Sequence, residues 1–155
     1  MKTFIITLFS VFAAVIAGAI VYLDWPKQEP APAAQPHLLA VEQASFPRTS
    51  WSFAGYANPA ASFESAMWAC GSGNLNQFQA SLSPDAQQKE QLQLQQMKPA
   101  DLVHEFRNVT GFKITREELV SDDQVRLRFH ADGVNADKDA TLVKVGNDWK
   151  LDAIP

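Results

Sequence analysis

An uncharged apolar run near the N-terminus limits what this chain can fold into more than any other feature. Residues 3–23 read TFIITLFSVFAAVIAGAIVYL and contain no charged residue in 21 positions. About 20 apolar residues allow a helix to cross the hydrocarbon core of a bilayer, where a helix satisfies its own backbone hydrogen bonds. We therefore expect a transmembrane segment with its ends at Phe4 and Leu23, inside an anchor of residues 1–25.

The residues that flank this run predict its orientation. Lys2 and the amino terminus are positive on one side, whereas the charges of Asp24, Lys27 and Glu29 nearly cancel on the other. The positive-inside rule then places the N-terminus in the cytoplasm and the rest of the chain outside the cytoplasmic membrane, in the periplasm. The reverse orientation, with a cytoplasmic domain, stays open as the remaining alternative.

A cleaved signal peptide is a second interpretation of the same run. Ala17-Gly18-Ala19 has the small-x-small pattern that signal peptidase accepts, so that cleavage near Ala19 would release the rest of the chain. The apolar run continues past this point to Leu23, however, and exceeds the usual signal-peptide core. This length favours a retained anchor, and both interpretations place the domain in the same compartment.

Residues 26–50 have the composition of a tether. They contain Pro26, Pro30, Pro32, Pro36 and Pro47, five of the nine prolines in the chain, and alanine fills much of the remainder. Proline fixes φ and removes a backbone donor, so the stretch favours extended, solvated conformations. We expect it to act as a semi-rigid spacer.

Residues 51–155 are expected to form a soluble α+β domain. Cap-and-proline signals at Asn58-Pro59 and Ser83-Pro84, a cap at Asn74 and a start at Pro99 predict three to four helices, one of them running to about Met97. After Gly111 the period changes from helical to alternating, which predicts about four strands. The expected strands cover residues 112–120, 125–131, 140–145 and 149–154. The helices should then pack on one face of an antiparallel sheet.

The side chains expected on the inner face of this sheet are all apolar: they are Val125, Leu127, Phe129, Val143 and Val145. We expect the loop before the third strand to hold a polar cluster formed by Asp132, Asn135, Asp137 and Asp139. Its spacing is not that of a calcium-binding loop.

Two short motifs resemble those of a known fold. The opening helix ends on Gly71-Ser72-Gly73-Asn74, and the last strand begins on Gly146-Asn147-Asp148-Trp149-Lys150. With the order of helices and strands over residues 57–155, they resemble the nuclear transport factor two-like, or cystatin-like, cone superfamily. The resemblance implies helices on a curved antiparallel sheet. It also implies a choice of functions, because the superfamily includes membrane-anchored subunits of secretion machines, other non-enzymatic modules, and small isomerases and dehydratases.

No residue pattern points to a reaction. His37, His104 and His130 lie in different predicted elements, without a second ligand at metal-binding spacing. The adjacent acids Glu117-Glu118 and Asp122-Asp123 are typical of strand ends and turns rather than of an acid/base pair. Cys70 is the only cysteine and is expected on a buried helix face. We therefore assign no catalytic residue, no cofactor and no metal ligand.

Aromatic residues around the first helix are the candidates for a binding role. Trp51, Tyr56 and Trp68 are possible interaction residues, with the alternative that they form the core and fasten the tether to it. The chain carries a net charge of −4 and no basic stripe, which argues against nucleic acid as a partner.

These observations favour a non-enzymatic domain outside the cytoplasmic membrane, which binds a protein partner, a second copy or a small ligand. An isomerase- or dehydratase-like enzyme is the main alternative. It would require an ionisable side chain aimed into the cone. An accessory protein of the cell envelope is the third possibility, in which the tether sets the reach from the membrane.

Overall fold

The computed structural model describes residues 37–39 and 45–153 of the chain. The expected transmembrane segment, Phe4 to Leu23, lies outside these residues, as does most of the expected tether. Within the described part, no helix combines the length and the apolar character needed to span a bilayer.

Five α-helices precede the main strands of the described domain. They are α1 (Pro59–Ser72), α2 (Leu75–Ser81), α3 (Pro84–Lys89), α4 (Gln91–Gln96) and α5 (Pro99–Glu105). The long strands are β3 (Gly111–Ser121), β4 (Gln124–Asp132), β5 (Ala136–Val145) and β6 (Asp148–Ala153). Two short strands, β1 (His37–Leu39) and β2 (Ser45–Pro47), come before the helices, and a 3-10 turn over Arg48–Ser50 follows β2.

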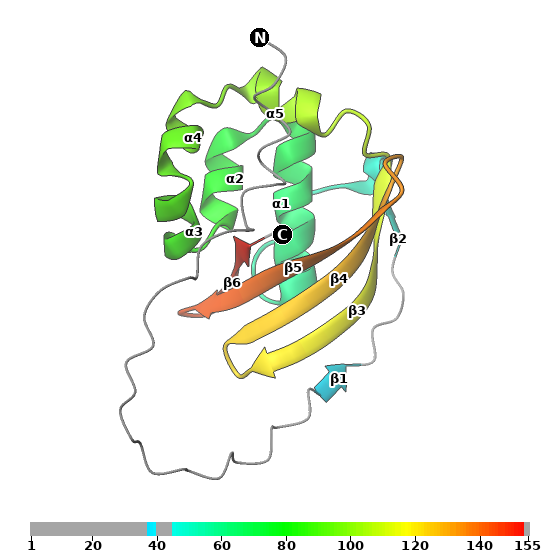
Figure 1. The fold of residues 1–155 in the computed structure, drawn as a ribbon, viewed down its shortest axis with the longest axis vertical. Coiled ribbons are helices and arrows are strands. Elements are labelled where there is room, and N and C mark those ends of the chain that lie inside the picture. Colours follow the sequence, from blue (N-terminus) through cyan, green and yellow to red (C-terminus); the bar gives the residue numbers. More distant parts are fainter. Residues whose placement is uncertain (1–36, 40–44, 154–155) are drawn as a thin grey trace, which may run out of the picture.

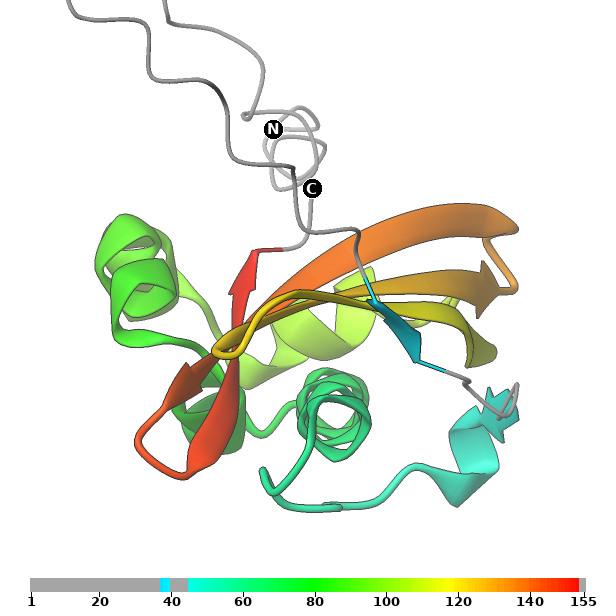
Figure 2. The same ribbon diagram turned by 90° about the horizontal axis from the view of Figure 1, so that it is seen from below.

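The strands form one antiparallel sheet that curls around α1 (Figures 1 and 2). Their order is β1-β3-β4-β5-β6, and β2 also pairs with β3. The view in Figure 2 shows the helices on one side of the sheet only. Irregular pairing between Ile114 and Arg116 and between Thr141 and Leu142 accompanies the bend of the strands. The predicted α+β class and the antiparallel meander are therefore confirmed.

Two predicted boundaries were wrong. The helix expected from Ser83 to Met97 is broken at Glu90, so that α3 and α4 are separate. None of the α4 residues is fully buried, and Leu94 is its one side chain that packs, partly buried, against the core, so few tertiary contacts oppose the break between α3 and α4. The third strand begins at Ala136 rather than Ala140, because Asp137 and Asp139 belong to β5 and not to a loop.

The expected inner face was correct for β4 and wrong for β5. Val125, Leu127 and Phe129 are at most 4% exposed. On β5 the inward side chains are Ala140 and Leu142, both 0% exposed. Val143 pairs with Gln124 and takes the opposite face of the sheet from Leu142, and Val145 is 39% exposed. Residues 143–145 (VKV) alternate as a strand does, but the pairing of Leu142 with Val125 decides which of them face inward.

Helix α1 is the element on which the sheet packs. The Asn58 side chain caps its first turn by accepting from the Ala61 amide, and Gly73 ends it with φ 71°. Phe63 is fully buried, with its ring centroid 5.2 Å from that of Phe112 on β3 and 4.6 Å from that of Phe129 on β4. Burying each side chain of this size stabilises the fold by about 1.5–3 kcal/mol.

A strap over residues 46–51 fastens the start of the domain to this core. The Arg48 guanidinium donates to the carbonyl oxygens of Phe106 (2.6 Å), Val109 (3.2 Å) and Gly71 (3.1 Å). The indole Nε1 of Trp51 donates to the Phe46 carbonyl at 2.9 Å. A Cβ at position 71 would lie 2.9 Å from the Trp51 ring, so the glycine lets the indole pack on α1.

The strap and the short strands correct one sequence expectation. The composition of residues 26–50 favours extended, solvated conformations, whereas in the structure His37–Leu39 pairs with residues 117–119 of β3 and Ser45–Pro47 pairs with residues 111–113. Both short strands therefore lie along the edge of β3 that does not pair with β4.

Replacing Arg48 tests whether the strap stabilises the domain. We expect Arg48→Met to lower the free energy of unfolding by about 2 kcal/mol, because three carbonyl groups lose a charged donor. The measurement is urea denaturation followed by tryptophan fluorescence. Arg107→Met is the matched control on an exposed arginine and should change stability by less than about 0.5 kcal/mol. Equal midpoints for the two variants would show that the strap adds nothing.

Candidate functional site

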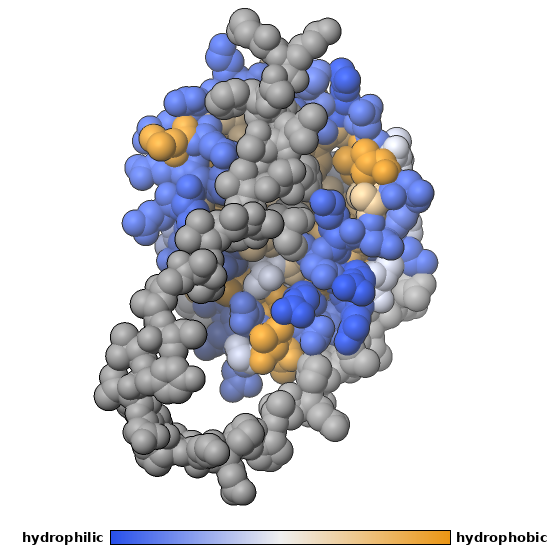
Figure 3. Space-filling model, viewed as in Figure 1, coloured by the Kyte–Doolittle hydropathy of each residue, from blue (hydrophilic) through white to orange (hydrophobic). Residues whose placement is uncertain are grey.

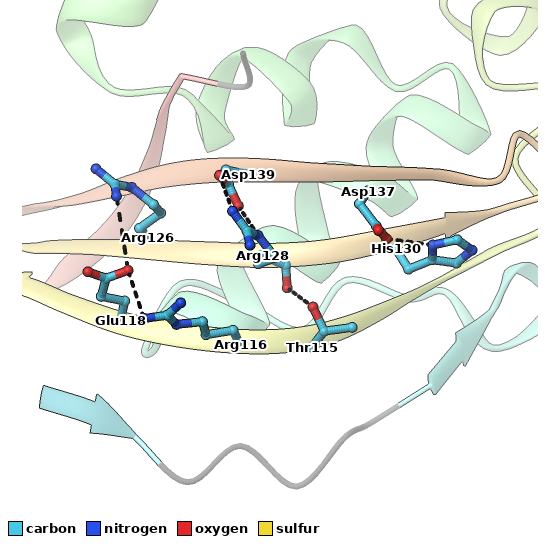
Figure 4. A network of polar contacts seen from close by, with 8 residues as sticks. All are labelled: Thr115, Arg116, Glu118, Arg126, Arg128, His130, Asp137 and Asp139. Atoms are coloured by element: carbon cyan, nitrogen blue, oxygen red, sulfur yellow. Dashed lines mark hydrogen bonds and ion pairs between the residues drawn. The ribbon is translucent and has the colours of Figure 1, made fainter. Parts of the chain in front are cut away.

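The face of the sheet turned away from the helices carries most of the charged strand residues. We call it the outer face, and define it by three cross-strand rows on β3, β4 and β5. The rows are Glu118–Arg126–Thr141, Arg116–Arg128–Asp139 and Lys113–His130–Asp137. Figure 4 shows the side chains of most of these residues on the three strands, and the part of this face visible in Figure 3 is largely hydrophilic.

The middle row contains the strongest ion pair of the outer face. The Arg128 Nε and Nη2 atoms donate to the two carboxylate oxygens of Asp139 at 2.8 and 3.1 Å. This bidentate contact, together with the charge of the guanidinium, holds the pKa of Asp139 below its usual range. Asp139 in turn raises the pKa of Arg128. Arg128 is thus fixed in place and neutralised by its neighbour on β5.

Arg116 and Arg126 are less well neutralised than Arg128. Both approach the same Glu118 oxygen, Oε2, at 3.7 and 4.0 Å, which are ion-pair distances but too long for hydrogen bonds (Figure 4). Arg116 also lies directly opposite Arg128 in the strand register, and like charges in this position repel each other. Two guanidinium groups therefore share one carboxylate next to a third arginine.

The three arginines surround a shallow depression in the outer face. Its volume is about 270 Å³, and its lining residues are Arg116, Glu118, Arg126, Arg128 and Asp139. The arginine side chains are 45% to 53% exposed, so their remaining donors face solvent. With two carboxylates against three guanidinium groups, the lining carries one surplus positive charge.

The far row has a different character. His130 Nδ1 lies 2.7 Å from Asp137 Oδ1, and its Nε2 lies 3.9 Å from Asp132 Oδ1. His130 lies in register opposite Asp137, on the side of the sheet away from the core. Sequence reasoning missed this pair because it placed Asp137 in a loop.

The inner face leaves little room for chemistry. Phe112, Ile114, Leu127 and Leu142 are 0% or 1% exposed and form part of one continuous core with α1. Glu117 is the acidic exception, because it lies opposite the buried Leu127 and is itself partly buried. Burial raises the pKa of this carboxyl group. Glu117 and Glu118 take opposite registers, so the two carboxylates are not brought together as a pair.

The three aromatic candidates lie in different surroundings. Trp51 is only 9% exposed and belongs to the core and the strap. Tyr56 is partly buried: its hydroxyl accepts from Gln77 Nε2 at 2.6 Å, and Lys150 Nζ lies 3.4 Å from its ring centroid. Trp68 is partly buried on α1, with its ring 6.1 Å from that of the half-exposed Phe53. These rings are thus largely occupied by contacts within the domain.

The remaining candidate ligands are scattered. Cys70 is buried, and desolvation raises the pKa of its thiol. His104 lies at the surface beside Arg107, and no group of three or more histidine, cysteine or acidic side chains suited to a metal ion occurs within residues 37–39 and 45–153. His37 pairs in β1, at the edge of the sheet, far along β3 from His130, which lies opposite Lys113.

The ion pair of the middle row can be tested by titration. We expect the carboxyl pKa of Asp139, measured by NMR, to lie below that of an ordinary aspartate, and Arg128→Gln to raise it towards the ordinary value of about 4. Because folding lowers this pKa, the ion pair stabilises the fold at pH values above the ordinary aspartate pKa. This stabilisation is lost as the pH falls through the folded-state pKa of Asp139. Arg107→Gln should leave the Asp139 titration unchanged, whereas an unshifted Asp139 in the parent protein would contradict the structure.

Comparison with known proteins identified no relative of this chain. No protein-family model matches it, and neither a curated protein nor a solved structure is significantly similar to it.

Proposed function

We propose that this protein is a non-enzymatic binding module that is held at a membrane and presents the outer face of its sheet to a partner. The observation that carries the proposal is the placement of three arginines around an open depression on that face. The ion pairs there are surface pairs, which contribute about 0–1 kcal/mol each. The ion pairs of the outer face therefore contribute much less to the free energy of unfolding than the core does.

The filled inner face argues against the enzymatic alternative. An isomerase or dehydratase of the cone type needs an ionisable group at the end of a pocket, whereas the described core is closed by Phe63, Phe112 and Leu127, all 0% exposed. Glu117 is partly buried on this side, but it does not line the depression of the outer face. Membership of the cone superfamily remains part of the proposal, supported by the curled sheet around α1.

The membrane part of the proposal rests on the sequence. The anchor would end near Leu23, and residues 26–36 would separate it from β1. At about 3.1 Å per residue for a polyproline stretch, these eleven positions reach on the order of 35 Å. Since β1 pairs with residues 117–119, the chain enters the domain beside the end of β3 that precedes the β3–β4 turn.

Membrane extraction tests the anchor. We expect the full chain to stay in the membrane pellet after washing at alkaline pH, and its intact mass to include residues 1–19. A protein that is released by the wash, and whose mass shows cleavage after Ala19, would establish the secreted form instead.

Site-specific photocrosslinking tests the binding surface. We expect a photoreactive residue at Thr141, on the outer face, to give a discrete adduct in membranes of the source organism. The same residue at Gln88, exposed on α3 away from this face, is the matched control and should give none. Adducts at Gln88 alone, or monomer at both positions, would contradict the proposed function.

A further inference from the structure

We infer that Arg116 and Arg126 form a carboxylate-binding site that recognises an acidic segment of a partner protein. This inference rests on the proposed function, because it assigns a chemistry to the partner of the outer face.

The two guanidinium groups have unused hydrogen-bonding capacity. Each guanidinium carries five N–H donors, yet within the described residues the Arg116 and Arg126 side chains take part in ion pairs with Glu118 and in no hydrogen bond. Arg128, by contrast, uses two donors on Asp139. Most of the surplus donors thus belong to Arg116 and Arg126, the two arginines that approach Glu118.

The depression carries a small net positive charge. Three guanidinium groups and two carboxylates line the depression, which leaves a net charge of +1. One carboxylate placed between the arginines balances this charge. Bidentate pairing of a guanidinium with a carboxylate is also among the stronger hydrogen-bonded contacts. A carboxylate that contacts Arg116 would in addition relieve its repulsion with Arg128.

The exposure of the arginines favours a peptide segment over a small free acid as the ligand. The arginine side chains are about half exposed, so each contact is screened by water and salt and is individually weak. A free small acid would then bind poorly. A peptide segment with several acidic side chains can lie along the outer face and combine such contacts, which fits a depression that is open rather than enclosed.

The binding experiment uses the full chain in nanodiscs of uncharged phosphatidylcholine. The probe is a fluorescent hexaglutamate peptide, with hexaglutamine as the uncharged control, and binding is measured by anisotropy. We expect hexaglutamate alone to bind, with an affinity that falls as the salt concentration rises. Arg116→Gln/Arg126→Gln should weaken this binding by at least about tenfold.

A matched double variant separates the site from general charge. Arg107→Gln/Lys89→Gln removes two exposed positive charges elsewhere and should change the affinity less than about twofold. Urea denaturation of both double variants shows whether each is folded. The inference is overturned if the two variants bind hexaglutamate equally well, or if hexaglutamine binds as tightly.

Two further outcomes would assign the site to another ligand and so overturn the inference. Displacement of the peptide by inorganic phosphate, at concentrations where acetate has no effect, would make it a phosphate site. A dimer that Arg116→Gln/Arg126→Gln dissociates, without peptide binding, would make the occupant a second copy. An adduct at Thr141 without peptide binding would overturn the carboxylate assignment alone, whereas the absence of both would overturn the proposed function as well.

Discussion

The packing of α1 against the inner face of the sheet is the interaction on which the rest of the structure depends. Phe63 contacts the rings of Phe112 and Phe129 from the helix side, and β3, β4 and β5 curl around this contact. The same core takes in Trp51, which connects it to the strap, and Leu151 on β6. Because an antiparallel sheet of this kind buries one face only, the use of the inner face for the core leaves the outer face available for a partner.

The outer face carries charges that contribute little to the stability of the fold. Its ion pairs are too exposed to contribute much to stability, and Arg116 faces Arg128 across the strands in an arrangement that folding alone would not favour. Such a surplus of charge makes sense if a partner neutralises it. In the proposed arrangement the tether would enter at the neighbouring edge, along β3, and the anchor would hold the domain at the membrane while the strands of the outer face remain accessible.

Local signals in the sequence predicted the domain well, and long-range pairing explains what they missed. Asn58-Pro59 and Gly73 marked α1 because caps depend on neighbouring residues. The start of β5 was missed because Asp137 and Asp139 have low strand propensity, and only Arg128 and His130 on the adjacent strand compensate for it. The arginine site could not be predicted for the same reason, because positions 116 and 126 come together only through the β3–β4 register. The aromatic candidates were chosen by residue type, and aromatic residues also form the core.

The central claim, that a partner covers the outer face in the cell, is tested most directly by thiol accessibility in native membranes. Cys70 is buried, so a cysteine introduced at Thr141 would be the reactive thiol of the domain. We expect Thr141→Cys to be protected from a polar maleimide in membranes and to react after detergent has separated the chain from its partner, whereas Gln88→Cys should react equally in both. Equal labelling of Thr141→Cys before and after extraction would show that no partner covers the outer face.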